Sequence, residues 1–292
     1  MRSLVFLSLI AGAILTNSNS VDAAPGGLYS SRTQQWVVLD QALSEVKPGS
    51  VVIIGENHGL RAHQTQQIAI LQILDYKKLN VSVGMEFFSY PDQALVNQYR
   101  AGTLDEESFL KAAHWGTLDF SYYRGQVNFP MKSKGGMTVA LNAPRALTGK
   151  IAKTGLSSLT PEELNILPPD FTLGRDSYKT RFIENVPHKM PEEAMNRMFA
   201  AQSAWDDTMA WQAQKFLKAH PTQVLVIIVG EFHSQYGGGL PDRLRARGVS
   251  SVLTFSQINT AEYADDQLTE LIAPSLRDGA RADYLWLAPA EE

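Results

Sequence analysis

Cysteine is absent from this sequence of 292 residues. The chain therefore has no disulfide bond, no thiolate metal ligand and no Cys-x-x-Cys-His motif for attaching a cofactor covalently. It also has no cysteine that could carry a lipid anchor. An exported protein without disulfides suits a bacterial periplasm, where these bonds are optional.

Long hydrophobic runs are missing after the N-terminus. The apolar run Leu4–Thr16 follows a basic start, and it is shorter than the roughly 20 residues that cross a bilayer. The small or compatible residues at Val21-Asp22-Ala23 suit cleavage after Ala23. We therefore expect residues 1–23 to be a cleaved signal peptide and the mature protein to be periplasmic.

An excess of positive charge is also missing, because 26 Lys and Arg residues against 30 Asp and Glu residues give a formal net charge of -4. The chain has no overall basic field, so nucleic acid is not expected as a partner. No P-loop follows the glycines at 237–239, and no Gly-x-Ser-x-Gly motif occurs. Nucleotide binding and serine hydrolase chemistry are therefore disfavoured.

Short β-branched runs alternate with helical patterns along most of the chain. The expected strands are 50–54, 81–85, 137–141, 224–229 and 249–255. Strands that alternate with helices indicate an α/β fold with a mostly parallel β-sheet flanked by helices.

Residues 149–220 interrupt this alternation and contain no good strand. Residues 191–219 within them are expected to form one long helix, which begins at Pro191. We interpret 149–220 as a helical cap subdomain inserted into an α/β core that comprises 24–148 and 221–292.

Polar side chains follow the expected strands where each strand ends. These side chains are Glu56, His58, Glu86, Asn142, Glu231 and His233. Glu56 with His58, and Glu231 with His233, belong to two copies of a Gly-Glu-x-His turn. Ligands of open parallel sheets bind beyond the carboxyl ends of the strands, so we expect these groups to share one edge of the sheet.

Three interpretations of this cluster stay open. His58 and His233 could ligate a divalent metal ion such as zinc, manganese or iron. Alternatively, a histidine could act as a general base among Glu56, Glu86 and Glu231 in a hydrolase. The same residues could instead only tie strand ends together. The acids of Trp205-Asp206-Asp207 could reach the cluster or face water.

An ordered series of motifs resembles a known family. The motifs are 51–58, Val83-Gly84-Met85-Glu86-Phe87, Leu141-Asn142-Ala143-Pro144-Arg145, 202–210 with its Trp-Asp-Asp-x-Met-Ala core, and Gly230-Glu231-Phe232-His233 followed by Gly-Gly-Leu-Pro-Asp-Arg-Leu. From about residue 35 to 256, the sequence is similar to the ChaN-like haem-binding proteins of the Tiki and erythromycin-esterase superfamily.

The resemblance implies a function in haem and iron uptake, with ferric haem as the ligand. It implies haem at a homodimer interface, a tyrosine ligand to the iron, and histidine and lysine contacts to the propionates. The matching candidates are Tyr178 for the iron and Lys179, His188 and Lys189 for the propionates. Tyr122, Tyr123 and Tyr236 are alternative tyrosines.

The resemblance also has implications for partners and for activity. Haem transport components of the outer or inner membrane are the expected partners. Hydrolases of the wider superfamily use the same glutamate and histidine positions, so an esterase or peptidase is the alternative function.

Overall fold

The computed structural model describes residues 26–187 and 190–289. Within these ranges the chain forms one eight-stranded sheet with the order β2-β1-β8-β7-β3-β6-β4-β5. The strands are β1 Leu28–Ser30, β2 Gln35–Val37, β3 Val51–Glu56, β4 Asn80–Ser89, β5 Thr138–Asn142, β6 Gln223–Gly230, β7 Val252–Asn259 and β8 Tyr284–Ala288. The strands from β8 to β5 are parallel, whereas β1 is antiparallel to both β8 and β2. The expected α/β fold with a mostly parallel sheet is confirmed.

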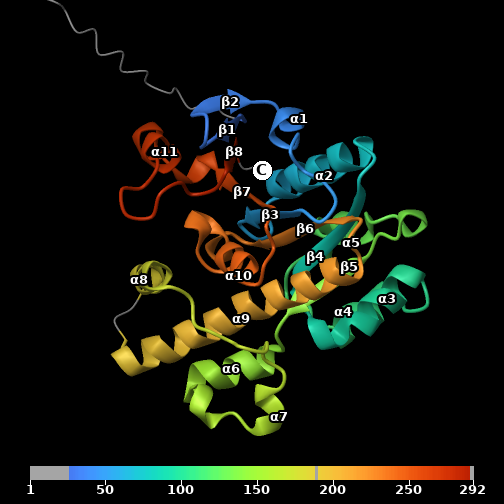
Figure 1. Cartoon of the computed structure of the whole chain (residues 1–292), viewed down its shortest axis with the longest axis vertical. Helices are drawn as coiled ribbons and strands as arrows, with labels where there is room; N and C mark the ends of the chain where they lie inside the picture. Colours follow the sequence, from blue (N-terminus) through green and yellow to red (C-terminus); the bar gives the residue numbers. More distant parts are fainter. Residues whose placement is uncertain (1–25, 188–189, 290–292) are drawn as a thin grey trace, which may run out of the picture.

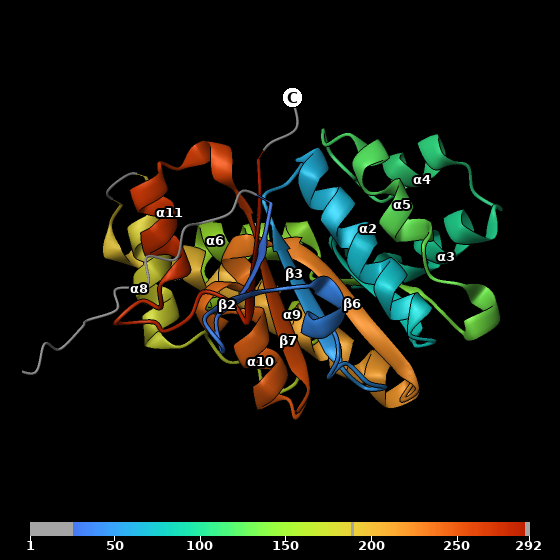
Figure 2. The same ribbon diagram turned by 90° about the horizontal axis from the view of Figure 1, so that it is seen from above.

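Helices cover both faces of the sheet. They are α1 Leu39–Ala42, α2 Arg61–Tyr76, α3 Gln93–Ala101, α4 Glu106–Ala112, α5 Arg124–Asn128, α6 Arg145–Thr154, α7 Pro161–Leu164, α8 Asp176–Asn185, α9 Glu192–Ala219, α10 Leu240–Ala246 and α11 Asp265–Ile272. Figure 1 shows α2 on one side of the central strands and the long helix α9 on the other. Seen from above, α2, α3, α4 and α5 gather on one side of the molecule, opposite α8 and α11 (Figure 2).

Alternate residues of the central strands face opposite sides of the sheet. In β3, Val52 and Ile54 belong to the hydrophobic cluster that includes α2, whereas Val51 and Ile53 belong to the cluster that includes α9 and α10. All four side chains are fully buried, and burying each contributes about 1.5–3 kcal/mol. Because the strand period is two, Glu56 continues the series that faces α2.

The structure refines the expected elements. The long helix is confirmed as α9, and each of the five expected strands corresponds to one of β3 to β7. The short strands β1 and β2 and the C-terminal strand β8 were not predicted. No helix of the described ranges is long and apolar enough to cross a membrane.

The division into core and cap stays a prediction, and α9, which lies within 149–220, contacts both parts. The second half of α9, including Met209 and Phe216, packs on the sheet. Its first half, including Ala200 and Ala204, packs against Leu147 of α6. One continuous helix therefore joins the cluster around α6 to the core.

Candidate functional site

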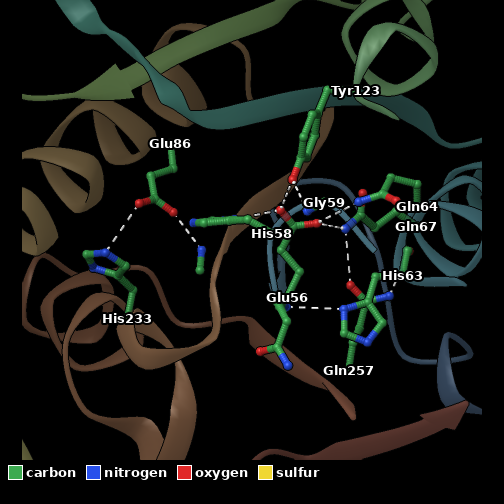
Figure 3. Close-up of polar contacts among 12 residues, drawn as sticks. Glu56, His58, Gly59, His63, Gln64, Gln67, Glu86, Tyr123, His233 and Gln257 are labelled. Atoms are coloured by element: carbon green, nitrogen blue, oxygen red, sulfur yellow. Dashed lines mark hydrogen bonds and ion pairs between the residues drawn. The ribbon is translucent and has the colours of Figure 1, made fainter. Parts of the chain in front are cut away.

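The two Gly-Glu-x-His turns meet at one edge of the sheet. Strands β3 and β6 are parallel neighbours, and Glu56 lies opposite Gly230 in their register. In Figure 3, the carboxylate of Glu86 lies between His233 and the Nε2 end of His58. The predicted convergence of the glutamates and histidines is therefore confirmed.

Glu86 reaches this edge from within a strand. We expected a strand that ends before Glu86, but β4 continues to Ser89. The register between β4 and β5 shifts between Met85 and Ser89, an irregularity of the kind that re-aims side chains. Asn142, at the end of β5, spans this stretch by donating from Nδ2 to the Glu86 carbonyl at 2.9 Å. Asn142 therefore ties two strand ends together.

The first turn presents a histidine that is held from behind by a buried carboxylate. His58 Nδ1 donates to Glu56 Oε1 at 2.8 Å, and the His58 side chain keeps 38% of its surface exposed. Burial alone would lower the pKa of His58, but the hydrogen bond to Glu56 and the charges of Glu86 and Glu56 raise it above its ordinary value. His58 can therefore exchange a proton at Nε2 while Glu56 fixes its orientation.

Glu56 is almost fully buried and accepts several hydrogen bonds. The Tyr123 hydroxyl donates to Oε1 at 2.6 Å and accepts from the Gly59 N–H at 3.1 Å. The amide of Gln67 donates to Oε2 and also to Gln257. These donors compensate the burial of the carboxylate, as a charge away from water requires.

The second turn places its histidine between two carboxylates. His233 Nδ1 donates to Asp206 Oδ1 at 2.7 Å, and its Nε2 lies 3.3 Å from Glu86 Oε1. Burial would lower the pKa of His233, but Glu86 and Asp206 raise it to about 10. Burial also opposes ionisation of Glu86, yet His233, His58 and the Gly230 N–H lower its pKa to about 2. His233 is therefore a buried cation at neutral pH.

Glu231 does not share the role of Glu56. It forms a bidentate ion pair with Arg281, at 2.6 and 2.7 Å, and also accepts from the Ser256 hydroxyl. For this residue, the interpretation as a tie between strand ends fits the structure best.

Cavities lie on two sides of His58 and Glu86. An apolar cavity of about 450 Å³ has walls that include Phe87, Phe182 and Trp205. A second, more polar cavity of about 630 Å³ also contains His58 and Glu86, together with residues of the second turn. His58 is thus accessible from an apolar compartment and from a polar one.

Comparison with known proteins identifies the family of this chain. The family described as haem-binding uptake, Tiki superfamily, ChaN matches residues 42–244, which is more than half of the chain. The chain belongs to the ChaN family. A search among curated proteins finds no match.

Solved structures show the same fold. ChaN of Campylobacter jejuni, described with cofacial haem binding, is 18% identical and superimposes with a TM-score of 0.64, covering 89% of this chain and 96% of that one. An erythromycin esterase, an EreC variant in its open conformation, is 10% identical with a TM-score of 0.52, covering 90% and 97% of the two chains. At these identities the likeness concerns the fold alone.

The environment of Tyr178 does not suit the iron ligand expected of it in this ChaN family member. Tyr178, the candidate for the iron ligand, is fully buried. Its hydroxyl donates to Asp206 Oδ2 at 2.9 Å and accepts from Gln202 Nε2 at 3.0 Å. Burial first, and then the charge of Asp206, raises the pKa of Tyr178 well above its ordinary value. Its hydroxyl therefore supports the Asp206–His233 pair and is not presented to a ligand.

The other residues expected to contact haem differ in their burial, and two of them lie outside the described residues. Lys179 is half-buried in α8, while His188 and Lys189 lie outside the described residues. Among the alternative tyrosines, Tyr123 is buried against Glu56. Tyr122 and Tyr236 are half-buried, and neither lines the apolar cavity.

A divalent metal site is not found in the part of the chain that the structure describes. There, no group of three or more histidine, aspartate or glutamate side chains is arranged to hold a metal ion. Both nitrogens of His233 already face carboxylates. The proposed pairing of His58 with His233 as metal ligands has no geometric support.

Proposed function

We propose that this ChaN family member is a periplasmic protein that binds ferric haem for haem and iron uptake. The apolar cavity beside His58 carries this proposal, together with membership of a haem-binding family. Its aromatic and sulfur-containing walls suit a porphyrin, because small-molecule sites are mostly apolar with a few placed polar groups. The volume of about 450 Å³ lies in the range of such sites.

His58 is the proposed iron ligand in place of Tyr178. It lines the apolar cavity, and an added Cβ at Gly230 would lie 3.1 Å from its Nε2, so the glycine leaves space there. A metal-ligating histidine commonly donates its other N–H to a carboxylate, which makes the imidazole a stronger donor. Glu56 accepts that hydrogen bond here and so favours the ferric state.

Titration with ferric haem tests the proposal. The protein should form a saturable complex, and His58→Ala should lose the spectrum of an imidazole-ligated iron. Tyr178→Phe should keep that spectrum. If Tyr178→Phe changes the spectrum and His58→Ala does not, the ligand assignment is wrong.

A cavity-filling pair of variants tests the location. Gly149 lines the cavity, and an added Cβ there would meet nothing within 4 Å. Gly149→Phe should therefore fold normally and weaken haem binding at least tenfold, whereas the control Gly149→Ala should bind as the parent does. Equal haem affinity in both variants would exclude this cavity.

Export and assembly are further parts of the proposal. The sequence of residues 1–23 supports a cleaved signal peptide, so mature protein recovered from a periplasmic fraction should begin at residue 24. We propose a homodimer on haem binding and transfer to membrane haem transport components. Molar mass in solution should double when haem is added, and an unchanged mass would contradict the dimer.

A hydrolase is the second candidate, and the Glu56–His58 pair favours it. His58 Nε2 can take a proton from water that attacks a carbonyl carbon, and can return it to the leaving group. Glu56 holds the ring and stabilises the imidazolium. The resulting substrate class is an ester or a peptide.

An esterase screen separates the two functions. Because Glu56 and Glu86 raise the pKa of His58 against the effect of burial, activity should rise as the pH passes through that pKa. His58→Ala should abolish it. Activity that persists in His58→Ala would end this interpretation, and metal analysis of the purified protein tests the metal-assisted version.

A further inference from the structure

Arg145 occupies a distinctive position in the wall of the apolar cavity. It is the first residue of α6, its side chain is exposed, and it lines the cavity. An added Cβ at Gly116 would lie 3.9 Å from its Nη1, which places the guanidinium near that glycine. The cavity therefore has a cationic group where it meets solvent.

Protein carboxylates do not neutralise this cation within the described residues. Lys150, on the same helix, pairs with Glu163, whereas Arg145 forms no such pair there. The first turn of α6 contains no acidic residue, and its N-cap side chain makes no hydrogen bond. The helix dipole adds to the positive potential at this end.

Glu86, the one acid among the described residues that line this cavity, is already matched. Glu86 faces the His233 cation, and its carboxylate accepts from the Gly230 N–H at 2.6 Å. A ligand carboxylate would have to compete with Glu86 for the His233 cation, whereas at Arg145 it meets a cation that has no carboxylate partner among the described residues. Charge thus orients an apolar anionic ligand inside the cavity.

We infer that Arg145 recognises the carboxylate of an apolar ligand and thereby selects for it. This inference rests on the proposed function, in which that carboxylate is a propionate of haem. The planar guanidinium can donate two parallel hydrogen bonds to a carboxylate, which a lysine cannot. Arg145 is then a specificity-determining residue, and iron ligation does not depend on it.

Haem and its dimethyl ester, compared as ligands, test this role. The ester keeps the porphyrin and the iron but lacks carboxylates. Arg145→Gln should weaken haem binding about 10- to 100-fold, the range expected for hydrogen bonds to a charged group, and change ester binding less than about threefold. Lys153→Gln, which removes the same charge from an exposed position on α6, is the matched control and should change neither.

Each outcome separates this inference from the proposed function. Equal weakening for both ligands, or none for haem, overturns the role of Arg145 while leaving haem binding intact. Absence of saturable binding of either ligand to the parent protein overturns the proposed function itself. Arg145→Lys should retain an intermediate haem affinity, and circular dichroism confirms that each variant is folded.

Discussion

The two Gly-Glu-x-His turns have the same residue pattern and opposite environments. In the first turn, the glutamate is buried and the histidine is accessible. In the second, the glutamate is paired with Arg281 and the histidine is enclosed by Glu86 and Asp206. The first turn therefore presents an accessible imidazole, and the second encloses a histidine between two carboxylates.

Backbone differences produce this inversion. Strand β3 continues through Glu56, whereas β6 ends at Gly230 and the next three residues form a short 3-10 helix. The side chains after the two strands consequently point to different neighbours. A shared motif predicts that residues come together, and the surrounding elements decide what each one does.

The largest expected difference between the turns is in stability. His233→Ala leaves the carboxylates of Glu86 and Asp206 without their shared cation, so the free energy of unfolding should fall by about 3–5 kcal/mol. His58→Ala removes a half-exposed ring and one donor to the buried Glu56 carboxylate, and should cost about 1.5–3 kcal/mol. Urea unfolding of the two variants measures both values. Equal losses would show that the turns are energetically equivalent.

The pH dependence of stability gives a second test of the difference between the two turns. The pKa of His233 is raised from 6.5 to about 10, so the stability from its charge is complete below pH 6.5 and is lost as the pH rises toward 10. This pH-dependent loss of stability cannot exceed the loss of stability caused by His233→Ala. The His233→Ala variant should not show this pH dependence. NMR titration should show His58 titrating below His233. A neutral His233 at pH 7 would contradict the two-carboxylate enclosure.

A smaller effect is expected from the tyrosine behind the first turn. Tyr123→Phe removes the hydroxyl that donates to Glu56, so the free energy of unfolding should fall by about 1.5–3 kcal/mol. Tyr122→Phe changes a half-buried neighbour and should stay within about 0.5 kcal/mol. Thermal unfolding distinguishes them, and similar values would remove Tyr123 from the support of Glu56.

The smallest change is expected at the contact between the turns. In Gly230→Ala, the new methyl group would lie 3.1 Å from His58 Nε2, and the half-exposed ring can move away. Stability should change by less than about 1 kcal/mol. The NMR signals of the His58 ring should nevertheless shift while those of His233 stay in place. An unshifted His58 would place its ring away from Gly230.

Much of the core was predictable because its signals are local. Buried parallel strands are continuous apolar runs, as at 51–54, and α9 has a proline before its first residue and acids in its first turn. Three-residue strands such as β1 and β2 carry no periodic signal. The irregular stretch of β4 around Glu86 depends on pairing with β5, which sequence periodicity does not contain.

The site was predictable in its members but not in its partners. Parallel topology alone places strand ends together, which is why Glu56, His58 and His233 were found. Asp206 reaches His233 from a helix, so its role depends on the packing of α9. Gln67, on the inner face of α2, was not predicted as a partner of the site. A glutamine among the apolar residues of that face indicates buried polar partners, because a fully buried glutamine requires them.

The antiparallel strand β1 links the beginning of the described fold to its end. Leu28 pairs with Trp286, although more than two hundred residues separate them in the chain. One side of β1 pairs locally with β2, whereas its other side pairs with the C-terminal strand β8, and such distant pairing is slow to form. Assembly of the sheet is therefore completed when the β1–β2 hairpin joins the last strand, and until that moment only the β8-facing side of β1 lacks its partner.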